Sequence, residues 1–102
     1  MFFLANYTPH AMKGLIGGDD RKAAVEALLA PVGGTLESIS FTRGEFDIAV
    51  VVDIPDRNSL MGVTMAISAS GAFSRISILE ELDRAAVVAA AQKVAKVYTP
   101  AG

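Results

Sequence analysis

Residues 35–56 read TLESISFTRGEFDIAVVVDIPD, and this segment carries the clearest structural signal in the chain. Two β-like runs, 35–42 and 45–54, are rich in Ile, Val, Phe and Thr. Only Arg43-Gly44 separates them, and a two-residue connection containing Gly is typical of a tight β-hairpin. Pro55-Asp56 then ends the second run and begins a helix. The segment therefore predicts a hairpin followed by a capped helix.

In this register the hairpin has one strongly apolar face and one face of small or polar side chains. The apolar face pairs Phe41 with Phe46 and Ile39 with Ile48. The second face pairs Ser40 with Asp47, Ser38 with Ala49, and Leu36 with Val51. We expect helices to cover the apolar face. We expect the second face to meet another surface, because its small side chains allow close approach.

The segments on either side of the hairpin complete a recognisable order. In chain order we expect a strand at 2–7, a helix at 9–16, a helix capped by Asp19 or Asp20 that closes around Ala30, the hairpin strands, a helix from Asp56 to just before Gly71, a strand at 72–79, a helix at 83–97 and a loose tail at 98–102. This βαββαβ order with an extra C-terminal helix predicts an α+β, ferredoxin-like antiparallel sheet with its crossover helices on one face. All 102 residues form one domain.

Composition excludes several classes of function. The net charge is −2 with acids and bases interspersed, so there is no basic stripe for nucleic acid. The chain has no Cys and one His, which argues against disulfides, thiol catalysis and a metal site. The N-terminal apolar run is too short for a signal peptide or a membrane span, so we expect no membrane partner and a cytoplasmic protein. The apolar fraction, 52%, slightly exceeds the usual range of about 45–50% and favours self-association.

The hairpin also resembles a known family. Gly44-Glu45-Phe46-Asp47, which leads into Ile48-Ala49-Val50-Val51-Val52 and ends at Pro55-Asp56, is similar to the defining motif of the GYD-domain family. Lys13-Gly14-Leu15, Asp20-Arg21 and Gly33-Gly34-Thr35 stand where that family has its first helix, an Asp-Arg step and the entry to its second strand. The resemblance covers residues 2 to about 79. It implies a ferredoxin-like domain of the dimeric α/β-barrel type, in a family whose functions are largely uncharacterised.

This chain departs from the family pattern in two places. Phe46 stands where the family usually has Tyr, so a phenol is missing there. The last strand ends Ile76-Ser77-Ile78-Leu79-Glu80-Glu81, which differs from the more usual ending of the family.

Three residues are candidates for catalysis: His10, Asp47 and Tyr7. His10, the only histidine, could act as a general base or as a haem ligand, or it could be a solvated residue at a helix start. Asp47 could orient a substrate, or it could accept local backbone hydrogen bonds that fix the hairpin. The second of these alternatives is the better supported for both residues.

Candidates for ligand binding come from the small-residue face and the hairpin turn: Ser38, Ser40, Arg43, Glu45 and Asp47. Arg43 is more simply a solvated turn residue, and Gly44 supplies the positive φ that the turn needs. We therefore expect a homo-oligomer that holds a small ligand between two sheets, with no cofactor. The alternative is an enzyme, a cofactor-independent or haem-linked monooxygenase or isomerase of the dimeric α/β-barrel kind. A third hypothesis is a pure assembly module that uses the Ala-rich helix at 83–97 as a second contact surface.

Overall fold

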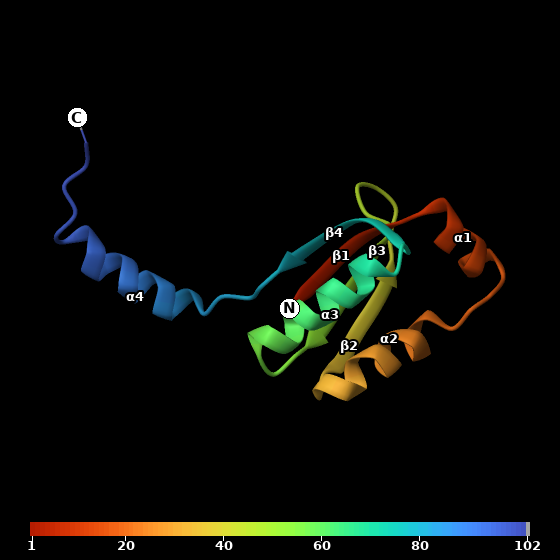
Figure 1. Ribbon diagram of the computed structural model, residues 1–102. Helices are drawn as coiled ribbons and strands as arrows, with labels where there is room; N and C mark the ends of the chain where they lie inside the picture. The colour runs from red at the N-terminus through yellow and green to blue at the C-terminus, as the bar shows by residue number, and fades with distance from the viewer. Residues whose placement is uncertain (102) are drawn as a thin grey trace.

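The computed structural model describes residues 1–101 and contains one four-stranded antiparallel sheet with four α-helices (Figure 1). The elements are β1 (Phe2–Tyr7), α1 (Pro9–Ile16), α2 (Arg21–Leu29), a 3-10 turn (Ala30–Val32), β2 (Thr35–Phe41), β3 (Ile48–Asp53), α3 (Arg57–Ala69), β4 (Phe73–Leu79) and α4 (Arg84–Ala95). The strand order is β2-β3-β1-β4. This arrangement confirms the predicted ferredoxin-like α+β fold.

The hairpin register differs from the predicted one. Phe41 pairs with Ile48, so six residues, 42–47, connect the strands instead of Arg43-Gly44 alone. The Thr42 N–H donates to the Asp47 carbonyl (2.9 Å) and closes the loop, and Gly44 adopts a φ of +136°. The predicted pair of Phe41 with Phe46 is therefore wrong. A two-residue loop would form a compact turn, whereas the observed six-residue loop is long enough to contact both β1 and β4.

A bulge in β2 produces a second correction. The register shifts between Leu36 and Ser38, so Leu36 pairs with Val52 and not with Val51. Because side chains alternate along a strand, the extra residue Glu37 moves Leu36 to the helix-covered face. There Leu36 packs against the core.

The hydrophobic core lies between the sheet and the helices α2 and α3. Its buried members include Ala5 and Tyr7 of β1, Ile48 and Val50 of β3, and Leu29 of α2. Gly34 allows α2 to sit this close, because a Cβ at this position would lie 3.2 Å from Cδ2 of Leu29. Each α-helix begins at a side chain that accepts a backbone N–H: Thr8, Asp20, Asp56 and Asp83.

No helix of the described part of the chain covers the other side of the sheet (Figure 1). We call this side the bare face. Two cross-strand rows define it: Ser38, Val51, Phe2 and Leu79, followed by Ser40, Ala49, Leu4 and Ser77. Leu79 is 51% exposed and Phe2 39%. The predicted face of small residues therefore exists, and larger apolar side chains of β1 and β4 extend it.

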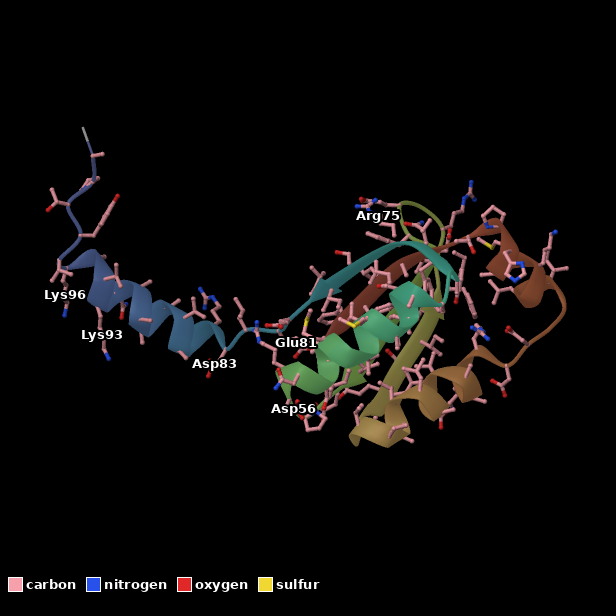
Figure 2. All side chains as sticks on the ribbon, viewed as in Figure 1. Asp56, Arg75, Glu81, Asp83, Lys93 and Lys96 are labelled. Atoms are coloured by element: carbon pink, nitrogen blue, oxygen red, sulfur yellow. The ribbon has the colours of Figure 1, made fainter. Side chains whose placement is uncertain are left out.

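Helix α4 extends away from the rest of the domain at the end of β4 (Figure 1). All its residues are exposed, including Val87 and Val94. The radius of gyration is 17.7 Å, against about 13 Å for a compact chain of this length. We call residues 83–97 the arm. Figure 2 shows Asp83, Lys93 and Lys96 on the arm, well separated from Asp56 and Arg75 of the domain. The bare face is thus not covered by its own C-terminal helix. Among residues 1–101, no helix is long and apolar enough to cross a bilayer.

Candidate functional site

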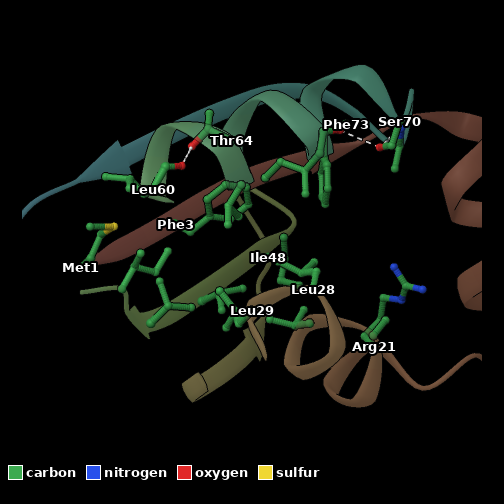
Figure 3. A pocket seen from close by; sticks show the side chains of 18 of the residues that line it. Met1, Phe3, Arg21, Leu28, Leu29, Ile48, Leu60, Thr64, Ser70 and Phe73 are labelled. Carbon is green, nitrogen blue, oxygen red and sulfur yellow. Dashed lines mark hydrogen bonds between the residues drawn. The ribbon is translucent and has the colours of Figure 1, made fainter. Parts of the chain in front are cut away.

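An apolar cavity of about 290 Å³ lies between the sheet and the helices α2 and α3 (Figure 3). Phe3, Ile48 and Val50 of the sheet form its floor. Val25 of α2 and Val63 of α3 contribute to its walls. The cavity is therefore on the helix-covered side of the sheet, opposite to the bare face where a ligand was predicted.

The sequence of the two helices explains the space between them. α2 presents Ala24 and Val25 to the cavity, and α3 presents Val63 and Thr64. These four side chains are short, and the longer Leu28 of α2 and Leu60 and Ile67 of α3 also line the cavity without filling it. The cavity is partly open to solvent, since Leu28 of its lining is 37% exposed.

Two hydroxyl groups at the cavity are already used within α3. Oγ1 of Thr64 donates to the Leu60 carbonyl (2.9 Å), and Oγ of Ser70 donates to the Ile67 carbonyl (2.6 Å). Figure 3 shows the Thr64 contact as a dashed line. Neither hydroxyl proton is available to a ligand. Tyr7 and Arg21 are the remaining polar side chains of the lining.

Tyr7 holds a fixed position at this cavity. Its side chain is 7% exposed, and its ring stacks on Phe73 with centroids 5.1 Å apart. Burial raises the pKa of the Tyr7 phenol above its ordinary value, the positive charge of Arg21 lowers it, and the carboxylates of Asp19 and Asp47 raise it further. The phenol is therefore neutral at physiological pH and can donate a proton to a hydrogen bond.

Arg21 is the first residue of α2 and lies at one end of the cavity in Figure 3, opposite to Met1. Its guanidinium is paired with Asp19 through Nε (2.9 Å to Oδ1) and Nη2 (2.8 Å to Oδ2). This bidentate pair orients the guanidinium, and N–H groups not used by Asp19 remain. The sequence analysis did not identify Arg21 as a site residue. The one feature that could have indicated it is the Asp20-Arg21 step of the family resemblance.

The structure brings two of the three catalytic candidates together. The Tyr7 N–H donates to Oδ2 of Asp47 (2.9 Å), and the Asp47 N–H donates to the Ala5 carbonyl (2.9 Å). Asp47 therefore fastens the hairpin loop to the end of β1, the local backbone role weighed above. His10 lies exposed on α1 and is not part of the cavity lining. His10 would therefore not be among the residues that hold a haem in this cavity.

The ligand-binding candidates fall into two groups, and neither group lines the cavity. Ser38 and Ser40 lie on the bare face, both exposed. Arg43 and Glu45 lie in the hairpin loop, where Glu45 forms an ion pair with Arg75 (2.9 Å). The Arg75 guanidinium also lies 4.6 Å from the centre of the Phe46 ring. The loop is thereby held against β4, which is a structural role for the aromatic residue of the motif.

Comparison with known proteins gave one match. The model of the family described as GYD domain matches residues 2–93. No curated protein and no solved structure matches the chain.

Proposed function

We propose a function from one premise: this chain belongs to the GYD domain family. In this proposal the protein is a homo-oligomer that binds a small, mainly apolar molecule in the cavity between the sheet and the helices α2 and α3. The observation that carries the proposal is the cavity itself, which is lined almost entirely by apolar side chains.

The size and lining of the cavity limit the ligand. Ligand pockets are typically about 300–1,000 Å³, and this cavity of about 290 Å³ lies at the lower end. Apolar side chains without partner atoms lose dispersion contacts, so a ligand that fills the space stabilises the folded state. A molecule with one aromatic ring or a short aliphatic chain suits these dimensions.

Two apolar surfaces that do not cover each other support the homo-oligomer. The bare face exposes Phe2 and Leu79, and α4 carries a stripe of Val87, Ala90 and Val94, which Val97 continues beyond the end of the helix. An isolated helix of 12 residues has marginal stability in water, and its stability depends on packing of its apolar side. A second copy of this chain offers complementary apolar surface to both. The dimeric α/β-barrel assembly implied by the family resemblance is of the same kind.

The enzymatic alternative stays a prediction. Of its three candidate residues, Tyr7 alone contributes to the cavity lining, while Asp47 contacts Tyr7 from the loop and His10 is exposed on α1.

Two substitutions on α2 form a matched test of ligand binding. Ala24 lines the cavity, whereas Ala27 on the same helix is exposed and does not. Leu and Ala both favour helices, so Ala24→Leu and Ala27→Leu differ mainly in whether they fill the cavity. The probe is ethylbenzene, and the readout is the shift in Tm that it causes.

We expect ethylbenzene to raise the Tm of the wild-type protein and of Ala27→Leu, and to have no effect on Ala24→Leu. The proposal fails if ethylbenzene leaves the wild-type Tm unchanged. It also fails if the probe stabilises all three proteins equally, because binding would then occur elsewhere.

A further inference from the structure

We infer that α4 of one copy packs antiparallel on the outer side of α3 of a second copy. This inference rests on the homo-oligomer of the proposed function, because it names the surface that the arm contacts there.

The side of α3 that points away from the sheet carries no charge after the first residue of the helix. A surface helix normally has charged or polar residues on the side away from the core, but Arg57 is the only charged residue of α3. We call the exposed residues of that side the outer face of α3: Asn58, Met61, Gly62, Met65, Ala66 and Ala69. Met61 is 56% exposed and Met65 74%. Exposed apolar surface of this kind marks a contact with another protein surface.

The arm has side chains at matching intervals. Val87 and Val94 lie seven residues apart on one side of α4, and Gly62 and Ala69 lie seven residues apart on the outer face of α3. The space above Gly62 is open, because a Cβ at this position would have no atom of the described chain within 4 Å. In an antiparallel pair, Val94 faces Gly62 and Val87 faces Ala69. Each valine then lies opposite a small residue, which lets two helices pack closely.

Charges at the helix ends favour the antiparallel direction. Asp56 caps the start of α3, where its carboxylate accepts hydrogen bonds from the neutral N–H and hydroxyl groups of Ser59. Lys93 and Lys96 lie near the end of the arm, and neither forms an ion pair within residues 1–101. Antiparallel packing brings these lysines to the end of α3 that carries Asp56. Opposite charges at matching ends select one orientation of a contact.

The connectivity of the chain explains why the partner is a second copy. A short turn, residues 70–72, joins α3 to β4, so the helix and the strand run in opposite directions (Figure 1). If α4 folded back over its own domain after β4, it would run parallel to α3. Lys93 and Lys96 would then lie at the end far from Asp56. The α4 of another copy is free of this restriction.

Introduced cysteines test the contact without background, because the chain has none of its own. The test protein carries Ala69→Cys with Val87→Cys. Its matched control carries Ala69→Cys with Val94→Cys, which moves the second thiol two turns along the same side of α4. Ser77→Cys with Val87→Cys tests contact with the bare face, and Val87→Cys alone tests contact between two arms.

The four full-length proteins are mildly oxidised and compared on non-reducing gels. A disulfide forms where two Cα atoms lie about 4.4–6.8 Å apart. We expect a covalent dimer of the test protein and none of the other three. Adding Gly62→Gln to the test protein should abolish the dimer, because the new side chain occupies the place of Val94 of the partner. Gln favours a helix more than Gly does and meets open space at this position, so the domain keeps its fold.

A covalent dimer of the matched control, of the Ser77→Cys protein or of Val87→Cys alone would place the arm differently and overturn the inference. Absence of any covalent dimer, in a protein that light scattering shows to be oligomeric, would also overturn it. Both results leave the homo-oligomer intact. A monomeric wild-type protein in light scattering would instead refute the homo-oligomer and the inference with it.

Discussion

The backbone N–H of Tyr7 donates a 2.9 Å hydrogen bond to Oδ2 of Asp47, 40 residues further along the chain. This contact joins the end of β1 to the loop between β2 and β3. Because Asp47 also donates its own N–H to Ala5, the residue extends the pairing of β1 with β3 by one step. The acidic residue of the family motif thereby positions the aromatic side chain that borders the cavity.

Removal of this acceptor should weaken the domain. In Asp47→Ala, the partly buried N–H of Tyr7 loses a charged partner, so we expect the free energy of unfolding to fall by about 1–3 kcal/mol. Urea denaturation measures the change. Ser40→Ala, at an exposed position of neighbouring β2, should stay within about 0.5 kcal/mol of wild type. An Asp47→Ala protein as stable as Ser40→Ala would show that the contact contributes nothing.

Alkaline titration should report the environment of Tyr7. The protein has two tyrosines, so in Tyr98→Phe the phenolate absorbance belongs to Tyr7 alone. Its pKa should lie above the ordinary value of 10.0, because burial disfavours the phenolate. The folded state then holds this proton more tightly than the unfolded state does. The resulting stability is fully present below pH 10 and is lost as pH rises through the folded-state pKa. Titration below pH 10 would contradict the burial of this ring.

Acid should weaken the start of α3. The Ser59 N–H donates to Oδ1 of Asp56 (2.8 Å) and the Ser59 hydroxyl to Oδ2 (2.9 Å). These bonds lower the pKa of Asp56 below its ordinary value of 3.8. Since the folded-state pKa is lowered, the contribution to stability is present above pH 4 and disappears as pH falls through the folded-state pKa.

The variant Asp56→Asn isolates this effect, because Asn also caps helices but carries no charge. Thermal unfolding of both proteins from pH 6 to pH 2 should show the wild type losing its advantage over the variant as the pH falls. A constant difference in Tm across this range would show that the charge of Asp56 does not matter.

The bare face should carry part of the contact between copies. Leu79→Glu places a charge in that face, whereas Ile16→Glu places one at the end of α1, where the side chain is 87% exposed. An unpaired charge in an apolar contact is unfavourable. We therefore expect light scattering to show a smaller particle for Leu79→Glu and an unchanged oligomer for Ile16→Glu.

The arm should carry the remainder of the contact. The double variant Val87→Lys with Val94→Lys should also reduce the particle mass, whereas Gln92→Lys, outside the apolar stripe, should not. A wild-type protein that is monomeric at high concentration would refute the homo-oligomer.

The fold was predictable from the sequence because apolar runs or periodic apolar positions mark each element, and Gly, Pro and Asp residues mark many of the boundaries between them. β1 was predicted with its observed bounds, and the four-stranded arrangement follows from the order of the elements. The predicted pairing of β2 with β3 was wrong by two residues. Because side chains alternate along a strand, a shift of two leaves Ser38 and Ser40 on the predicted side of the sheet. Leu36 changed sides because a bulge adds one residue, which no pattern in β2 indicates.

The cavity was not predictable in the same way. Its existence depends on how far apart α2 and α3 lie over the sheet, which is a property of packing between segments distant in sequence. Small residues such as Ala24 and Val63 are common on helices, and nothing in their spacing distinguishes a gap from a close contact. The polar residues of the strand faces pointed to a ligand on the bare face, whereas Tyr7 and Arg21 come to line one cavity only in the folded domain.

The central claim is that a small apolar molecule enters the space between the sheet and the helices α2 and α3. Methyl NMR spectra of the protein during titration with ethylbenzene test it most directly. The account predicts shift changes and ligand contacts for the methyl groups of Val25, Val50 and Val63, with Val94 and Val97 of the arm unaffected. Unchanged spectra, or changes confined to Val51 and Leu79 of the bare face, would contradict it.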